Sequence, residues 1–216
     1  PAVGKINIMV LSDGYQSNAL ATFESDVLDF YREFVITPPF KEYISYFNIF
    51  GSFVPSVNNG PAHPINGAVC ENGTPTQTSN HNNAFGSSLD NFNIHRGLAS
   101  DLNLVQNYLS SLDFANFIIF PIVFVNTSEF GGTANIPAGI ATVCSRYSVN
   151  IIPGEYNAYY DERVAIHELG HSFAQLQDEY YFPCPYSTPA ECTNFNIAPN
   201  RSENNNLNDS NHPWHH

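Results

Sequence analysis

The sequence AIHELGHSFA occupies residues 165–174, and the rest of the chain can be read outward from it. If this stretch is helical, His167 and His171 are one turn apart and their imidazoles share a face. Two imidazoles at that spacing can hold one zinc ion at about 2.0–2.1 Å. Glu168 follows the first histidine, where its carboxylate can reach a water in the open metal position and act as general base. The stretch therefore predicts a metal-binding helix.

Apolar residues around the motif recur at helical spacing, which predicts a largely buried helix over residues 161–174. They are Val164, Ile166, Leu169, Phe173 and Leu176. The alternative is a chance match, since a chain of this size shows HExxH by accident roughly one time in a hundred. The apolar surroundings and the acidic residues Asp178 and Glu179, which follow at once, favour a functional motif.

Composition indicates one globular domain, because the chain has 216 residues of which 43% are hydrophobic. We divide it into a catalytic subdomain, residues 1–182, and the irregular start of a C-terminal subdomain, residues 183–216. Seven Lys and Arg stand against 20 Asp and Glu, a net charge of -13 that argues against nucleic acid or an anionic membrane surface as partner. No apolar run is long enough for a membrane span. We expect a monomer that binds a protein or peptide.

Hydrophobic periodicity predicts an α/β (α+β) fold in which a mixed twisted sheet with an antiparallel edge strand is flanked by helices. Pro137 and Gly139 mark the edge strand, since proline is tolerated only at sheet edges or bulges. A long polar loop over residues 56–93 is expected to form a rim, with His63 and His81 exposed. The predicted strands cover residues 5–11, 43–55, 114–125, 134–145 and 150–153, and the helices 19–35, 95–112 and 161–174.

The four cysteines indicate an exported protein, either secreted, periplasmic or at the cell surface, because few lysines and many Asn, Tyr and Ser accompany them. We expect Cys184 to pair with Cys192 in a short loop. Cys70 would then pair with Cys144 and tie the long loop to the edge strand. Four cysteines allow three pairings, so the connectivity is a hypothesis.

HELGHSFAQLQDEY, residues 167–180, resembles the signature of the IgA peptidase family of zinc metalloendopeptidases. The resemblance extends over most of the chain, through LSDGY after the first strand, PPFKEYISYFNIF, AFGSS at 84–88 and FGG at 130–132. It implies a zincin-like, metzincin-type catalytic domain, Zn2+ as cofactor and an exported peptidase. The family name suggests host or extracellular glycoproteins such as immunoglobulin as substrates.

The chain departs from the metzincin pattern HExxHxxGxxH, because it has Ala174 and Gln177 where that pattern has its glycine and third histidine. Its one methionine is Met9, so no Met-turn follows the helix. A catalytic zinc usually has three protein ligands, and we assign the third to Asp178. This requires the chain to fold back between residues 174 and 177. Glu179 is the alternative ligand, and a hydrogen bond to a ligand histidine is the alternative role of Asp178.

The expected reaction is peptide-bond hydrolysis, with Glu168 as base and Tyr180, or else Tyr181, stabilising the transition state. The edge strand would hold an extended peptide by backbone pairing. The residues predicted to bind substrate there are Ile136, Ala138, Gly139 and Ile140. The competing hypotheses are a binding or adhesion module with a structural zinc, and an inactive peptidase relative. An intact Glu168 argues against both, since a structural site has no use for a base and an inactive relative would have lost it.

The end of the sequence is irregular, and it is rich in Pro, Asn and His. No element that could close a metal site is recognisable there. We expect the chain to be part of a longer protein, with a site floor supplied by residues beyond His216.

Overall fold

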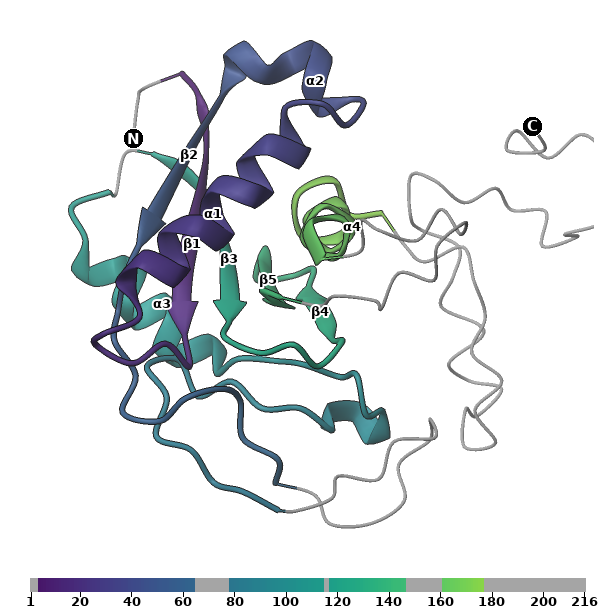
Figure 1. Ribbon diagram of the computed structural model, residues 1–216. Coiled ribbons are helices and arrows are strands. Elements are labelled where there is room, and N and C mark those ends of the chain that lie inside the picture. The colour runs from purple at the N-terminus through teal and green to yellow at the C-terminus, as the bar shows by residue number, and fades with distance from the viewer. Residues whose placement is uncertain (1–3, 65–77, 115–116, 147–160, 177–216) are drawn as a thin grey trace, which may run out of the picture.

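The computed structural model describes residues 4–64, 78–114, 117–146 and 161–176 (Figure 1). The strand predicted over residues 150–153, the subdomain 183–216 and three of the four cysteines lie outside these ranges. In chain order the strands are β1 (Ile6–Asp13), β2 (Phe47–Ser52), β3 (Ile118–Val125), β4 (Gly132–Asn135) and β5 (Ile140–Cys144). The helices are α1 (Leu20–Phe34), α2 (Phe40–Tyr43), α3 (Leu102–Ser111) and α4 (Asp161–Ala174), with 3-10 turns η1 (Ile44–Tyr46) and η2 (Asn91–Asn93).

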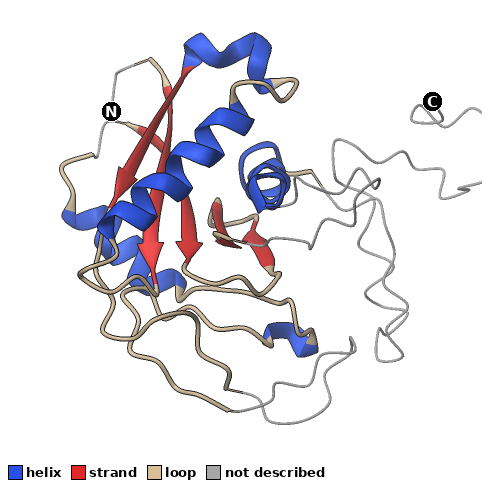
Figure 2. Ribbon diagram, in the orientation of Figure 1, coloured by secondary structure: helices blue, strands red, loops and turns tan. Residues whose placement is uncertain are grey.

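The five strands form one sheet in the order β2-β1-β3-β5-β4 (Figure 2). All neighbours are parallel except β4, which runs antiparallel to β5 at the edge. The prediction of a mixed sheet with an antiparallel edge strand is therefore confirmed. Among the described residues, no helix is both long and apolar enough to cross a membrane.

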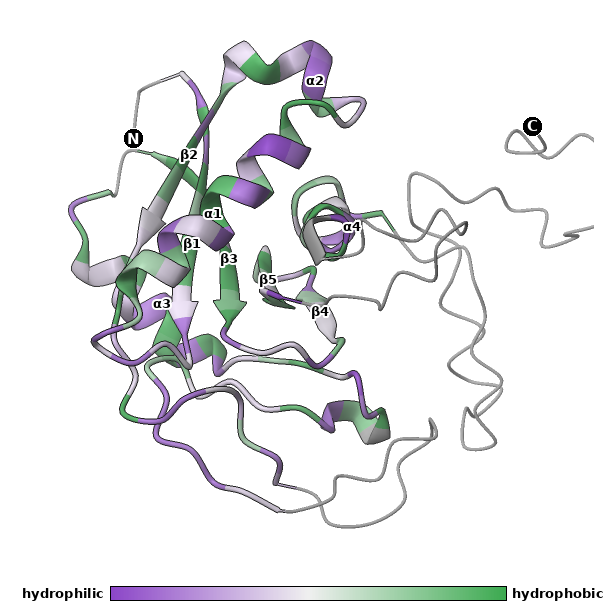
Figure 3. Ribbon diagram, in the orientation of Figure 1, coloured by the Kyte–Doolittle hydropathy of each residue, from purple (hydrophilic) through white to green (hydrophobic). Residues whose placement is uncertain are grey.

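Helices cover both faces of the sheet, which explains the continuous apolar runs in β1 and β3. On one face α1 and α4 pack against alternate strand residues, and the ring of Phe30 meets Phe124 of β3 edge to face at 5.7 Å. On the other face α3 and the segment before it pack through Val105 and Leu98. Figure 3 shows the hydrophobic colour concentrated in the strands and on the inner sides of these helices.

The stretch predicted as one edge strand, residues 134–145, instead contains the end of β4, a turn and all of β5. Asn135 accepts a hydrogen bond on Oδ1 from the Ala138 amide at 2.8 Å, and Gly139 has φ +66°. These features reverse the chain, so Pro137 lies in the turn and not in a strand. As a result β5 is an interior strand, and β4 forms the edge of the sheet on this side, opposite the β2 edge.

Two other predicted elements begin later than expected. The strand expected from residue 43 begins at Phe47, because Phe40–Tyr43 and Ile44–Tyr46 form α2 and η1. The helix expected from residue 95 begins at Leu102. Asp101 caps it, since its side chain accepts from the amides of residues 103 and 104.

The buried carboxylate of Asp13, at the carboxyl end of β1, holds the long polar loop against the sheet. Its Oδ1 accepts from the Gly14 amide at 3.0 Å, the Ser56 hydroxyl at 3.0 Å and the Phe85 amide at 3.1 Å. Its Oδ2 accepts from the Ser87 amide at 2.9 Å. Segments far apart in the sequence thus meet at one side chain that is fully buried. The loop is expected to depend on it.

Replacing Asp13 with Ala should lower the free energy of unfolding by at least about 3 kcal/mol, because three amides and a hydroxyl lose their acceptor in a buried place. Asp13→Asn should cost less, since its amide oxygen can still serve the donors at Oδ1. Urea unfolding of both variants measures the effect. A loss below about 1 kcal/mol for Asp13→Ala would show that the loop is held by other contacts.

Candidate metal centre

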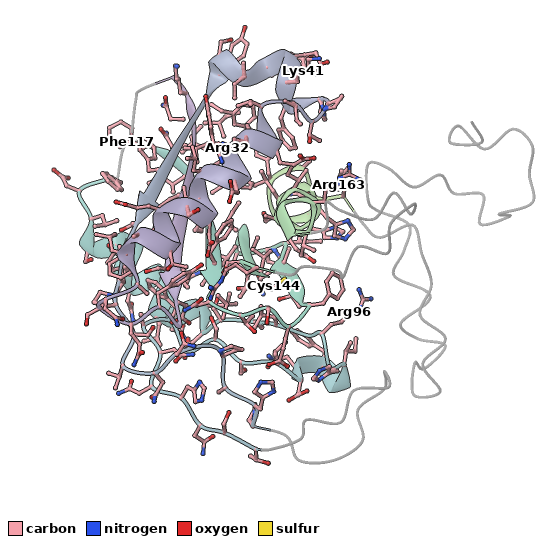
Figure 4. The ribbon with its side chains drawn as sticks, viewed as in Figure 1. Arg32, Lys41, Arg96, Phe117, Cys144 and Arg163 are labelled. Atoms are coloured by element: carbon pink, nitrogen blue, oxygen red, sulfur yellow. The ribbon has the colours of Figure 1, made fainter. Side chains whose placement is uncertain are left out.

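Helix α4 is positioned by its apolar side, which fixes the direction of its histidines. Val164, Ala165 and Leu169 are buried in the core shared with α1 and the sheet. The first turn is also tied to α1, where the Arg163 Nε lies 3.5 Å from the Glu33 carboxylate (Figure 4). With these residues turned inward, His167 is exposed and His171 is partly buried on the outer side of the helix.

The two histidines of the motif converge on one point. Their rings lie at 86° with centroids 4.6 Å apart, and the two Nε2 atoms are 3.1 Å apart. Two ligands of one tetrahedral zinc at about 2.0–2.1 Å are separated by about 3.4 Å. The side chains therefore already point their nitrogens at a common position, as a shared metal ion requires.

The Nδ1–H of His171 donates to the Leu176 carbonyl at 2.6 Å. In the neutral ring this bond keeps the proton on Nδ1 and leaves the lone pair on Nε2, as in ligand histidines of metal sites. The donor set thus fits zinc, whose preferred ligands include imidazole nitrogens. Within the described ranges no group of three or more His, Cys, Asp or Glu side chains is placed to hold a metal ion. Asp178 and Tyr180 lie outside them.

The chain folds back directly after α4, as the assignment of Asp178 requires. Gln175 has φ +56°, its amide donates to the His171 carbonyl at 3.0 Å, and the Leu176 amide donates to the Gly170 carbonyl at 3.2 Å. This is a left-handed helix end at a residue that is neither Gly nor Asn. The positive φ thus lies one residue after Ala174, within the range 174–177 where the chain was expected to fold back.

Glu168 lies beside the histidines but is 7% exposed, because it packs against the start of β4. A Cβ added to Gly132 would lie 2.9 Å from the Glu168 Oε1 and 2.8 Å from the Val164 Cγ1. Only a glycine therefore allows the strand to approach the carboxylate this closely. The close approach to Glu168 and Val164 explains why a glycine stands at the last position of the FGG sequence at 130–132.

A cavity of about 660 Å³ opens beside Glu168 and His171. It follows the open edge of β4, with the metal helix on one side and the segment before α3 on the other. Most of its side chains are apolar, and a hydroxyl pair, Ser100 and Thr142 at 2.8 Å, adds polar atoms. Its apolar lining includes Phe92, Ile94, Ala99, Leu102, Ile136, Ile140 and Leu176.

The four predicted substrate-binding residues fall into two groups. Ile136 and Ile140 line the cavity. Ala138 and Gly139 lie in the turn between β4 and β5, and Ala138 packs against the core on the α3 side.

Sequence reasoning missed the residues at 92–102 that form the far wall of the cavity. Arg96 lines it and stacks over the Phe130 ring at 6.0 Å (Figure 4). The segment lacks the periodicity of a helix or strand. It is brought to β4 by long-range bonds, such as that from the Thr133 hydroxyl to the Leu98 carbonyl at 2.7 Å. No sequence pattern signals such contacts.

Two histidines and two acidic residues form a cluster next to the segment 92–102. His95 Nδ1 lies 2.8 Å from the Asp90 Oδ1 and His63 Nδ1 lies 3.4 Å from its Oδ2, while their Nε2 atoms lie 3.9 and 3.3 Å from the Glu129 carboxylate. The expectation that His63 is exposed is wrong, since its side chain is only 15% exposed. His81 is partly buried, and its Nδ1 faces the Gly60 carbonyl at 3.1 Å. Both loop histidines were expected on the surface because nothing local to them predicts these partners.

Tyr15 and Asp26 form a buried pair that ties the end of β1 to α1. The Tyr15 hydroxyl donates to the Asp26 carboxylate. Burial, then the Asp26 charge, raises the pKa of Tyr15, and burial also raises the pKa of Asp26 despite the nearby Arg146. Neither side chain lines the cavity beside α4.

Cys144, at the end of β5, is 1% exposed (Figure 4). Its predicted partner Cys70 lies outside the described residues, as do Cys184 and Cys192. The disulfide hypothesis stays a prediction.

Comparison with known proteins adds one finding. The model of the family described as IgA Peptidase M64 matches residues 1–210. No curated protein matches the chain.

Gly132→Ala should displace the Glu168 carboxylate and lower the free energy of unfolding by about 1–3 kcal/mol, the usual cost of overpacking. In a Glu168→Ala background the loss should be smaller, because one of the two clashing side chains is gone. Gly51→Ala in β2 is the matched control, since its Cβ would lie 3.3 Å from the Phe23 ring and 3.6 Å from the Val27 Cγ2, which are looser contacts than those at Gly132. Equal losses in both backgrounds would show that Gly132 does not act on Glu168.

Proposed function

The chain belongs to the IgA peptidase M64 family, a family of peptidases, and we propose that it is a secreted, zinc-dependent endopeptidase. The observation that carries the proposal is the convergence of the His167 and His171 Nε2 atoms, 3.1 Å apart, beside Glu168. Glu168 and His171 line a cavity of about 660 Å³, which is large enough for peptide side chains. A structural zinc site would need neither a carboxylate base nor a cavity beside it.

His167 and His171 would hold the metal, with Asp178 as third ligand. Zinc, when bound, polarises a carbonyl and makes a bound water more acidic. The Glu168 carboxylate accepts the proton as the water attacks the peptide carbonyl, and then delivers it to the departing amine nitrogen. Tyr180 is proposed to donate a hydrogen bond to the carbonyl oxygen as negative charge develops there.

The position of the turn at Gln175 supports the proposal that Asp178 is the third metal ligand. In the metzincin pattern the turning glycine stands three residues before the third histidine. Here the left-handed residue is Gln175 in place of position 174, one residue later. The ligand position moves by the same one residue, from 177 to 178. The chain at Leu176 already contacts His171, and two further residues span at most about 7 Å, so Asp178 is within reach of the histidine pair.

The edge of β4 is the proposed place for an extended substrate. The Gly132 amide points away from β5, since it donates to the Arg96 carbonyl at 3.2 Å. In an antiparallel ladder, residues that hydrogen-bond to the partner strand alternate with residues whose backbone groups point away from it. Thr133 pairs with Thr142 of β5, so the amide and carbonyl of Ala134, the next residue, point to the open edge. A peptide strand would pair there, and its side chains would enter the cavity. Host or extracellular glycoproteins, immunoglobulin among them, are the proposed substrate class.

Glu168→Gln should retain one zinc per chain and lose about 10²- to 10⁴-fold in kcat, because the amide cannot accept the proton. Cleavage of an internally quenched peptide and metal analysis of the same sample measure both quantities. Glu42→Gln in α2 is the control and should cleave like the parent. Peptide cleavage by Glu168→Gln at the parent rate would remove Glu168 from the mechanism.

Asp178→Ala should weaken zinc binding by orders of magnitude, whereas Glu179→Ala should not. Competition with a chelator of known affinity measures the two constants. The reverse order would assign the ligand to Glu179. Unchanged affinity in both variants would place the third ligand elsewhere in the chain.

A further inference from the structure

Phe92 is exposed in an unfavourable backbone conformation at the wall of the cavity. Its side chain is 73% exposed, the largest exposure among the large hydrophobic residues of the described ranges. Its φ and ψ are 58° and 23°, in the left-handed region that glycine and asparagine usually occupy. Neither the hydrophobic effect nor backbone preference accounts for a phenylalanine at this position. Residues held in such a conformation often lie at ligand-binding sites.

The loop that carries Phe92 is braced from both ends. The Asn91 amide donates to the Gly97 carbonyl at 3.0 Å, and its side-chain amide donates to the carbonyls of Ser88 and Gly97 at 2.7 and 2.9 Å. A Cβ on Gly97 would lie 2.2 Å from the Asn91 carbonyl oxygen, so only glycine allows this closure. The Asp90 amide also donates to the His95 carbonyl at 3.2 Å.

Side chains outside the loop hold it as well. Asp90, fully buried and itself at φ +63°, is contacted by the rings of His63 and His95. Glu129 lies on the opposite side of the same rings. These contacts therefore hold Phe92 in a fixed place, where its side chain lines the cavity.

We propose that Phe92 determines substrate specificity by binding an apolar side chain of the peptide. This inference rests on the proposed peptidase function and deepens it. The neighbouring lining residues Ile94, Leu102, Ile136 and Ile140 are apolar, so a hydrocarbon or aromatic side chain loses water against them and the Phe92 ring. An acidic side chain would lose its hydration against these apolar residues, and the cation of the same lining, Arg96, lies over the Phe130 ring.

The test uses the zinc-loaded full-length chain and a peptide set in which one position at a time is Gly, Leu, Phe or Asp. Phe92→Ala should lower kcat/KM by about tenfold or more for the preferred Leu or Phe peptide, mainly through KM. The Gly peptide at that position should change less than about twofold. Phe92→Tyr should retain the preference, because it keeps the ring. Tyr46→Ala, which removes an aromatic ring that is 59% exposed outside the cavity, is the matched control and should behave like the parent.

Two measurements do not depend on turnover. The affinity of the same peptides for Glu168→Gln, followed by fluorescence anisotropy, should fall in the Phe92→Ala, Glu168→Gln double variant. Phe92→Gly should raise the melting temperature, because glycine relieves the left-handed backbone, while still losing the peptide preference.

Cleavage by the parent with an unchanged preference in Phe92→Ala would overturn this inference alone. A parent that neither cleaves nor binds any peptide of the set would overturn the proposed function, and the inference with it. A uniform loss for all four peptides would show that Phe92 supports the fold of the loop and does not select the substrate.

Discussion

The carboxylate of Asp13 is the constraint on which the cavity depends. It sits at the end of a buried central strand and accepts from the amides of Phe85 and Ser87, which belong to a loop with no regular structure of its own. From there backbone pairing continues between Ser88 and Ala99, and the Ser100 hydroxyl reaches Thr142 of β5. A single buried charge thus sets the position of the wall opposite the metal helix. Buried backbone amides need acceptors, and the Asp13 carboxylate supplies them for Phe85 and Ser87 of this loop.

Helix α4 packs against the core with one side and carries the two histidines of HELGH on the other. Its inner residues are buried with α1 and the sheet, so the rotation of the helix is set by hydrophobic contact. Rotation then decides that both imidazoles face outward and that Glu168 faces β4. The close approach at Gly132 completes the arrangement, because a side chain there would occupy the position of the carboxylate. The orientation of the proposed reacting groups thus depends on buried apolar contacts and on the close approach of Gly132 to Glu168.

The cavity joins two kinds of surface around the edge of a sheet. The α4 side carries His171 and the Glu168 carboxylate, and the opposite side carries apolar residues with a hydroxyl pair. Between them lies β4, whose outer backbone groups at Ala134 are directed at the opening. Such a strand can fix the direction of an extended ligand by backbone pairing, while the two sides treat its alternate side chains differently. The braced loop at 90–97 adds the one large exposed ring.

The sequence by itself determined the elements whose signals are local. The HELGH spacing placed two imidazoles on one helical face. The apolar runs at residues 5–11 and 114–125 predicted two strands, which the structure has as Ile6–Asp13 and Ile118–Val125, because both patterns depend on short-range periodicity. It also placed a chain reversal after the metal helix. Only the tertiary structure decided where β4 ends and β5 begins, that the reversal uses a positive φ at Gln175, and that Glu168 is covered by a glycine of β4. It also brought His63 and His95 onto the buried Asp90, beside the loop that carries Phe92 at the cavity. These contacts join residues tens of positions apart, and their geometry depends on the packing of the whole sheet, which no local pattern records.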